Sequence, residues 1–305
     1  MNTPMRGIDR RPCLLLKSEI LRVTIFFLIL FPLAGITGQE YLWATPEEAK
    51  VNIQLLEEQL DRLAGDARDT AARLGRAALP VLLKRSRAES PRERVLVLEC
   101  LAKVQGDEAV LALVKALQDS EQDVWNTALD LLHTTYSPVA VGPLKKLLMK
   151  SPQARVRGEV ARVLGRMGAA AALPAIKAQA EKESDKEAAH KMNLSAARLE
   201  DGPARKKIVE RLSNPDPKIR YQAVGEIEYV NDPGLVKNLI PLFFDEARVV
   251  NVGQERWPVW HRVCDRALEA AAALTGKQLP FPVGRRSYTA EQIQQARELF
   301  ATTGK

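Results

Sequence analysis

The sequence predicts an all-α protein, an α-solenoid of about six antiparallel helix pairs with N- and C-terminal capping helices. Similar segments recur about every 32 residues, and apolar residues within them follow helical spacing. Aromatic residues make up only 5% of the 305 residues, and the apolar 46% consists mainly of Leu, Ala and Val. This composition favours stacked helices over a β-sandwich or barrel, whose strands prefer β-branched and aromatic residues.

Residues 1–38 have the pattern of a signal peptide or signal anchor. A basic stretch precedes residues 23–36, a run of 14 residues without charge. A membrane-spanning helix usually needs about 20 apolar residues, and Pro32 interrupts this run. We therefore expect a secreted or periplasmic protein, or one in another extracytoplasmic space. An uncleaved inner-membrane anchor and a misassigned start are the alternatives.

The net charge of +7 is smaller once this segment is set aside. Residues 1–38 contain five basic and two acidic residues, which leaves +4 for the remainder. That excess is modest, and an exported protein would not meet chromosomal DNA. Nucleic acid is therefore not expected as a partner, and a membrane is expected only if the apolar segment stays uncleaved.

Residues 45–75 are predicted to form N-terminal capping helices. Thr45 precedes Pro46 and two acidic residues, which is typical of a helix start. The residues that follow carry one apolar stripe at helical spacing. The stripe either seals the first repeat or pairs as a short coiled coil; its members are Ile53, Leu56, Leu60 and Leu63.

Residues 76–276 hold the repeats. Each repeat has a first helix that contains Leu and often Pro, a polar turn, and a second helix that starts near a β-branched residue. The second-helix starts are 29, 32, 63 and 44 residues apart. The spacing of 63 is two periods, with the missing start near residues 188–189, and the spacing of 44 contains an insertion. The aligned residues near these starts, from which the spacings are counted, are Val95, Val124, Val156, Ile219 and Val263.

Acidic residues are expected at the turns within the repeats. Their carboxylates can accept hydrogen bonds from the first N–H groups of the following helix. The residues predicted to cap in this way are Asp119, Asp123, Asp185 and Asp216.

The second helix over residues 155–168 resembles HEAT repeats, the armadillo-like helix pairs, in particular the short bacterial kind. It follows the family pattern from Arg155-Val156-Arg157 to the final Gly168, and Lys218-Ile219-Arg220 is a second match. The resemblance covers about residues 76–276. It implies a solenoid that makes binding surfaces but shares no chemistry. It further implies that the turn Asp residues pair with Arg157-type residues of adjacent repeats.

Residues 245–259 form the insertion before the last second helix. It carries Arg256 and Trp257, and Trp260 and His261 follow directly. Residues 249–252 and 256–259, on either side of Gly253, could pair as a short hairpin. Because loops and tryptophans often contribute to interfaces, this is a candidate binding loop. Alternatively, the two tryptophans plug the end of the superhelix.

Residues 277–305 are predicted to form a linker and a C-terminal capping helix. Thr289 and Gln292 have the spacing of a capping box. The following apolar residues would pack this helix over the last repeat.

No motif in the chain predicts catalysis. The three histidines, His133, His190 and His261, lie in different repeats, and no paired-cysteine, Walker or nucleophile-elbow motif occurs. We therefore expect no enzyme, no metal and no cofactor. Cys100 and Cys264 lie in apolar helical stretches five repeats apart, which predicts buried free thiols.

The function expected from these features is that of an exported, non-enzymatic scaffold or adaptor that binds a protein partner. Its binding residues would lie on a concave face of second helices and on the tryptophan-bearing loop. Two alternatives remain: a membrane-tethered solenoid, and a lyase-like or chromophore-handling protein such as the phycobilin lyases that HEAT repeats resemble. The candidate partner-binding residues are Trp257, Trp260, His261, Arg256, Arg157, Arg162, Arg166 and Arg220.

Overall fold

The computed structural model describes residues 46–104, 106–135, 137–251, 259–284 and 287–301. The chain divides into two units, residues 1–45 and 46–305, and all described residues lie in the second. Within them the protein is all-α apart from one two-stranded sheet. No described helix combines the length and the apolar content that a membrane span requires. The charge-free run at residues 23–36 lies outside the described residues.

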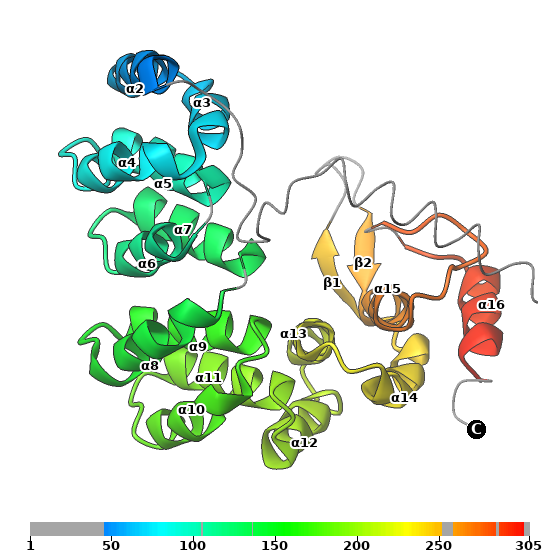
Figure 1. Ribbon diagram of the computed structural model, residues 1–305. Helices are drawn as coiled ribbons and strands as arrows, with labels where there is room; N and C mark the ends of the chain where they lie inside the picture. Colours follow the sequence, from blue (N-terminus) through cyan, green and yellow to red (C-terminus); the bar gives the residue numbers. More distant parts are fainter. Residues whose placement is uncertain (1–45, 105, 136, 252–258, 285–286, 302–305) are drawn as a thin grey trace, which may run out of the picture. The chain divides into compact units, whose positions relative to one another are not determined.

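Within the described residues, six helix pairs follow one another, as the sequence predicts (Figure 1). In each pair the second helix also packs on the second helix of a neighbouring pair. This stacking covers an apolar face that one pair alone could not bury. The pairs are α4 (Leu79–Arg85) with α5 (Pro91–Val104), α6 (Asp107–Ala116) with α7 (Gln122–Thr134), α8 (Val141–Lys150) with α9 (Ala154–Arg166), α10 (Leu173–Ala180) with α11 (Lys186–Arg198), α12 (Gly202–Arg211) with α13 (Pro217–Val230), and α14 (Val236–Leu239) with α15 (Val263–Thr275).

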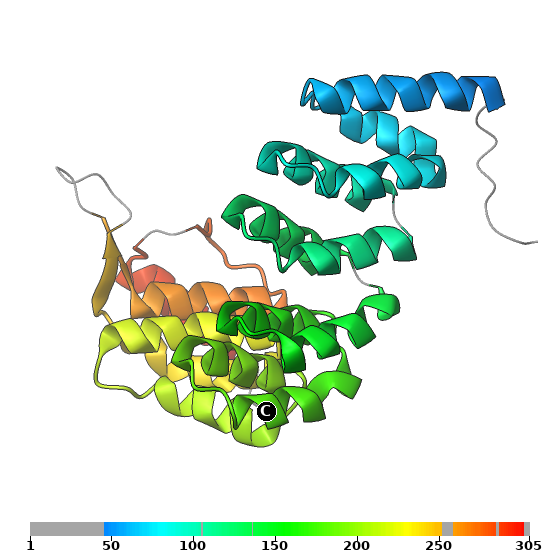
Figure 2. The same ribbon diagram turned by 90° about the vertical axis from the view of Figure 1, so that its left-hand side faces the viewer.

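Two further helices cover the start of the repeats, as Figure 2 shows in blue. They are α2 (Pro46–Asp61) and α3 (Ala67–Leu74), which pack on α5. Leu56 and Leu60 are fully buried there, so the α2 stripe seals the first repeat. Leu63 does not belong to the stripe, because it follows the end of α2 and is 42% exposed.

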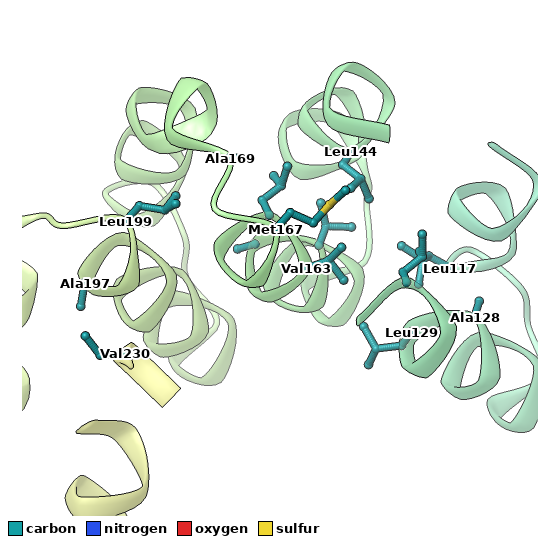
Figure 3. Close-up of a cluster of buried hydrophobic side chains, with 14 of the residues drawn as sticks. Leu117, Ala128, Leu129, Leu144, Val163, Met167, Ala169, Ala197, Leu199 and Val230 are labelled. Carbon is teal, nitrogen blue, oxygen red and sulfur yellow. The ribbon is translucent and has the colours of Figure 1, made fainter. Parts of the chain in front are cut away.

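The buried apolar side chains of successive pairs form one continuous core. Figure 3 shows part of it, with Leu144 of α8, Val163 of α9 and Met167, which follows α9, close together. Each fully buried leucine contributes on the order of 1.5–3 kcal/mol relative to an exposed one. The core therefore extends through the series of pairs, and each pair packs its apolar side chains against those of its neighbours.

Helices α9 and α11 pack closely because α9 has glycine at two positions seven residues apart. A Cβ atom at Gly158 would lie 3.0 Å from the Cα of Ala188. A Cβ atom at Gly165 would lie 2.8 Å from the hydroxyl of Tyr229 and 3.1 Å from the Cα of Ser195. Such distances are shorter than normal carbon contacts. The two glycines thus allow α11, and the Tyr229 side chain of α13, to reach α9.

Two of the four predicted caps are confirmed. Asp185 accepts a hydrogen bond from the N–H of Ala188 at the start of α11, and Asp216 accepts one from Lys218 at the start of α13. The prediction is wrong for Asp119 and Asp123. Helix α7 begins at Gln122 after Glu121, so Asp123 lies inside its first turn and Asp119 lies too far before it.

The insertion contains a short antiparallel hairpin, as the valine pattern suggests. Its strands are β1 (Arg248–Asn251) and β2 (Trp260–Arg262), with a bulge between Arg248 and Val250. The second strand begins later than expected, at Trp260. Residues 252–258 lie outside the described residues.

The C-terminal helix α16 (Ala290–Ala301) packs on α15 and on the 3₁₀ helix η5 (Ile240–Phe244). The predicted capping box is confirmed. The N–H of Thr289 donates to Gln292 Oε1 at 2.9 Å, and the N–H of Gln292 donates to Thr289 Oγ1 at 3.2 Å. Phe300 is fully buried, with its ring 5.8 Å from that of Phe243. This helix therefore covers the last pair.

Candidate functional site

Three arginines, each the fourth residue of a second helix, contact an acid of the next repeat and two carbonyls of the preceding turn, and we call these contacts the arginine clamps. In α9, Arg157 donates from Nε and Nη2 to the two carboxylate oxygens of Glu183, each at 2.7 Å. Its Nη1 donates to the carbonyls of Ser151 and Pro152, at 2.8 and 3.0 Å. Each clamp thus ties a turn within one repeat to the next repeat. The clamps are Arg94–Asp119, Arg157–Glu183 and Arg220–Asp245.

Two of the candidate binding residues, Arg157 and Arg220, belong to the clamps. Arg157 and Arg220 already use their planar donor groups on a carboxylate and on two carbonyls, so they stabilise the stack and do not offer free donors to a partner. The hydrogen bonds from Arg157 hold the pKa of Glu183 at about 2, well below its ordinary 4.5. The expected pairing of Arg157 with a turn acid occurs, but with Glu183 in place of Asp185.

The other end of α9 presents arginines in a different arrangement, which we call the Tyr229 cluster. The Cζ atoms of Arg162, Arg166 and Arg198 lie 5.6, 5.7 and 5.3 Å from the ring centroid of Tyr229. These distances are within the range of cation–π attraction. The cluster joins α9, α11 and α13, and it includes two of the arginines that the sequence singled out, Arg162 and Arg166.

Hydrogen bonds fix the centre of the cluster. The Tyr229 hydroxyl donates to the carbonyl of Arg162 at 3.1 Å and lies 3.4 Å from Ser195 Oγ. Arg198 Nη1 donates to the carbonyl of Tyr229 at the end of α13. The ring and one guanidinium are therefore held in place, while the Arg166 side chain is exposed.

Neighbouring acids balance the positive charge of the cluster only in part. Among the described residues, no carboxylate forms an ion pair with Arg166 or Arg198, whose Cζ atoms lie near the Tyr229 ring. Arg162 Nη1 is 3.6 Å from Glu159, whose other oxygen lies 2.7 Å from Lys191. Burial, with a smaller effect of Arg166, lowers the pKa of Arg198. Burial also raises the pKa of Tyr229, so the phenol is neutral and does not offset the arginines.

His133 of α7 lies near the same arginines but adds no charge to them. Burial, together with Arg166 and Arg162, lowers its pKa to about 4, so it is neutral at pH 7. Its Nε2 atom is buried and has no hydrogen-bond partner in the described part of the chain.

A further aromatic–arginine pair joins α7 to α9. The Cζ atom of Arg155 lies 3.8 Å from the ring centroid of Trp125, and both side chains are half-buried. Trp125 occupies the fourth position of α7, where α5, α9 and α13 carry a clamp arginine. We call the arginine and aromatic groups of this pair and of the Tyr229 cluster, which come from α7, α9, α11 and α13, the second-helix face.

Of the candidate binding residues in and directly after the insertion, the structure describes Trp260 and His261. His261 is fully buried, and its Nδ1 lies 2.9 Å from the Tyr221 hydroxyl, so it anchors the hairpin to α13 and does not face a partner. Trp260 is half-buried in β2. Arg256 and Trp257 lie outside the described residues, so the two interpretations of the insertion both remain predictions.

One hollow of about 350 Å³ lies on the first-helix side, between α6 and α8. Leu111, Val114 and Leu147 contribute apolar surface to it, and lysines line its edges. Lysine charges on long side chains are less fixed than the hydrogen-bonded arginines of the Tyr229 cluster. The second-helix face is therefore the better-defined candidate site.

Sequence reasoning missed Tyr229 and Arg198. The repeat period contains a signal for one of them, because Arg166 and Arg198 are 32 residues apart and each ends a second helix. Superposing the repeats would have placed these two arginines in one column. No comparable signal identifies Tyr229, because its contact with α9 requires a residue without a Cβ atom, Gly165, at that position of α9.

A family model for HEAT repeats matches residues 111–195, from α6 to α11. The chain contains HEAT repeats. The pairs that flank the matched range continue the same alternation of first and second helices. None of the curated proteins compared with the chain matches it.

Solved structures that are similar to this HEAT-repeat chain include the complex of CpcE and CpcF of phycocyanin lyase from Nostoc sp. PCC7120. That match has 18% identity, covers 90% of this chain and 98% of the other, and has a TM-score of 0.45. Two engineered proteins match at 16% identity. One match covers 83% of this chain and 77% of the other with a TM-score of 0.36, and the second covers 76% and 93% with 0.33.

Proposed function

We propose that the protein is a non-enzymatic scaffold that binds a protein partner through its second-helix face. The observation that carries the proposal is the Tyr229 cluster, in which three arginines surround one aromatic ring without a carboxylate on Arg166 or Arg198 among the described residues. Arginine and aromatic side chains are common anchors at protein interfaces. An acidic group of a partner would supply the missing negative charge.

The buried thiols support a role without covalent chemistry. Cys100 and Cys264 are both free and fully buried. Burial raises the pKa of each thiol to about 12, so neither is a thiolate at neutral pH. They act as small apolar groups of the core.

The compartment is part of the proposal. We infer that the scaffold works outside the cytoplasm, either after removal of residues 1–38 or with that segment as an anchor. The basic stretch followed by 14 uncharged residues supports this. N-terminal sequencing of the native protein distinguishes the two forms, and an intact N-terminus on a protein released with the cytosol would contradict both.

Partner capture with charge-matched variants tests the binding function. The full chain is used as bait in an extract of its own cells, as wild type, as Arg162→Gln with Arg166→Gln, and as Lys206→Gln with Lys207→Gln. The control pair removes the same charge from exposed positions of α12. Wild type and control should retain the same partner, and the arginine variant should retain at least tenfold less, since each charge-assisted hydrogen bond contributes about 1.5–3 kcal/mol.

Melting temperatures of all three baits establish that each is folded. Equal capture by all three baits would show that the second-helix face is not the binding surface. Absence of any specific partner in every bait would contradict the scaffold function itself.

A further inference from the structure

The Tyr229 cluster brings three positive charges close to one aromatic ring. Each guanidinium carbon lies less than 6 Å from the centroid of the same ring, and the three arginines come from two helices. Like charges in such an arrangement repel one another. An anion that contacts more than one of these guanidiniums would reduce the repulsion.

The protein does not provide that anion from its own described side chains. Glu159 is the acid nearest to Arg162, but it also pairs with Lys191 at 2.7 Å. The phenol of Tyr229 is neutral, and His133 is neutral as well. Arg162 therefore shares its counter-ion with Lys191, and Arg166 and Arg198 have no carboxylate partner among the described residues.

The cluster is also organised before any ligand binds. Gly165 lets the Tyr229 hydroxyl reach the carbonyl of Arg162, and Arg198 is hydrogen-bonded to the carbonyl of Tyr229. Donors that are already oriented lose less conformational entropy when they bind. Free N–H groups remain on the exposed Arg166 and on the second nitrogen of Arg198, since neither donates to another described group there.

We propose that the Tyr229 cluster binds the dianion of a phosphate monoester. A single carboxylate carries one charge, whereas a phosphate monoester carries close to two at pH 7 and has three acceptor oxygens for guanidinium donors. The three guanidiniums lie close to one ring, so a small dianion can contact more than one of them at once. Carboxylates spread along a peptide would each contact one guanidinium. This inference rests on the proposed function in one respect, because the phosphoryl group is taken to be carried by the protein partner.

Binding of small probes to the full chain tests the proposal without the partner. The probes are capped tripeptides Gly-Ser-Gly with phosphorylated serine, Gly-Glu-Gly, and unmodified Gly-Ser-Gly, titrated calorimetrically at constant ionic strength. The phosphorylated peptide should bind saturably with one site per chain. Its affinity should exceed that of the glutamate peptide at least tenfold, and the unmodified peptide should not bind.

Variants locate the site. Arg162→Gln with Arg166→Gln should weaken binding of the phosphorylated peptide at least tenfold, and Lys206→Gln with Lys207→Gln should leave it unchanged. Arg166→Gln alone is a second variant, since this exposed side chain makes no hydrogen bond to other described residues and its loss should not affect folding. It should weaken binding by a factor of three or more.

The outcomes separate this inference from the proposed function. Equal binding of the glutamate and phosphorylated peptides, no saturable binding, or binding that the arginine variants do not change would each overturn the phosphate site. Partner capture could still depend on Arg162 and Arg166 in those cases, and the scaffold function would stand. Conversely, a phosphate site whose loss leaves partner capture intact would support the site and contradict the binding role of this face.

Discussion

The two ends of α9 contain the same residue type in opposite situations. Near its start, Arg157 uses all three of its nitrogens on Glu183 and on two carbonyls. At its end, Arg166 is exposed and has no described carboxylate partner, although its Cζ lies 5.7 Å from the Tyr229 ring. The basic residues of α9 thus divide into a structural clamp and free donors according to their position along the helix.

The physical reason lies in the helix ends. Near the start of α9 lie two carbonyls of the preceding turn and Glu183 from the corresponding turn of the next repeat. Together they match the planar donors of arginine. At the other end the helix dipole already favours a basic side chain without a counter-ion. Arginine can therefore remain there unpaired and available to a ligand.

The largest expected effect comes from breaking a clamp. Arg157→Met should lower the free energy of unfolding by about 3–4 kcal/mol, because it leaves Glu183 without its partner while the Glu183 side chain is 0% exposed. Urea unfolding followed by circular dichroism measures the change. Arg92→Met in α5 is the control; this exposed residue makes no hydrogen bond or ion pair within the described part of the chain, and its change should stay within about 0.5 kcal/mol.

A similar loss in both variants would mean that the clamp is no stronger than an ordinary surface arginine. The contrast between the two ends of α9 would then disappear.

The second effect concerns pH. The folded-state pKa of Glu183, about 2, lies below its ordinary 4.5, so its contribution to stability is complete above about pH 4.5 and is lost as the pH falls toward 2. We expect Glu183→Gln to be less stable than wild type by about 2–3 kcal/mol at pH 7. The difference should shrink toward zero near pH 2. Urea midpoints between pH 7 and 2 measure it, and a difference that does not change with pH would exclude the carboxylate as its source.

The sequence predicted the repeats well and the cluster poorly, for a physical reason. Apolar spacing and turn residues are local signals, so the starts of α5, α7, α9, α13 and α15 could be placed from the sequence. Whether an arginine is paired depends on which acid the stack brings to it. Glu183 lies 26 residues after Arg157, and nothing local distinguishes it from Asp185, which caps α11 instead.

The same limit explains two other residues that the sequence does not place correctly. The position of His261 after two tryptophans predicts a partner-binding residue, but β2 turns it inward against Tyr221. Tyr229 organises the cluster without any local signal, because its role requires the close approach of α13 to Gly165. Both depend on packing between elements that are distant in sequence.

The third effect separates the cluster from the clamps. Gly165→Ala should lower the free energy of unfolding by about 1–2 kcal/mol, because its Cβ would lie 2.8 Å from the Tyr229 hydroxyl and 3.1 Å from the Cα of Ser195. Gly142→Ala in α8 is the matched control. Its Cβ would meet nothing within 4 Å, so the higher helix propensity of alanine should stabilise the protein by about 0.5 kcal/mol.

Thermal unfolding measures the two glycine variants, which should shift the melting temperature in opposite directions. If Gly165→Ala were as stable as Gly142→Ala, the close contact of α9 with α11 and Tyr229 would not be needed for the fold. The position of Tyr229 against α9 would then make no measurable contribution to stability.

The smallest expected effect comes from changing Arg166, which lies at the opposite end of α9 from Arg157. Arg166→Gln removes a charge that is repelled by Arg198 and Arg162, but also a favourable interaction with the C-terminal end of α9. We expect the two to nearly cancel, so the free energy of unfolding should rise by no more than about 0.5 kcal/mol at low salt, and salt should screen this difference toward zero. Urea midpoints in about 0.01 M and about 1 M NaCl measure the difference, because the Debye length falls roughly tenfold between these two concentrations. A loss of stability comparable to that of Arg157→Met would mean that Arg166 is a structural residue, and an arginine required by the fold would not be free for a ligand.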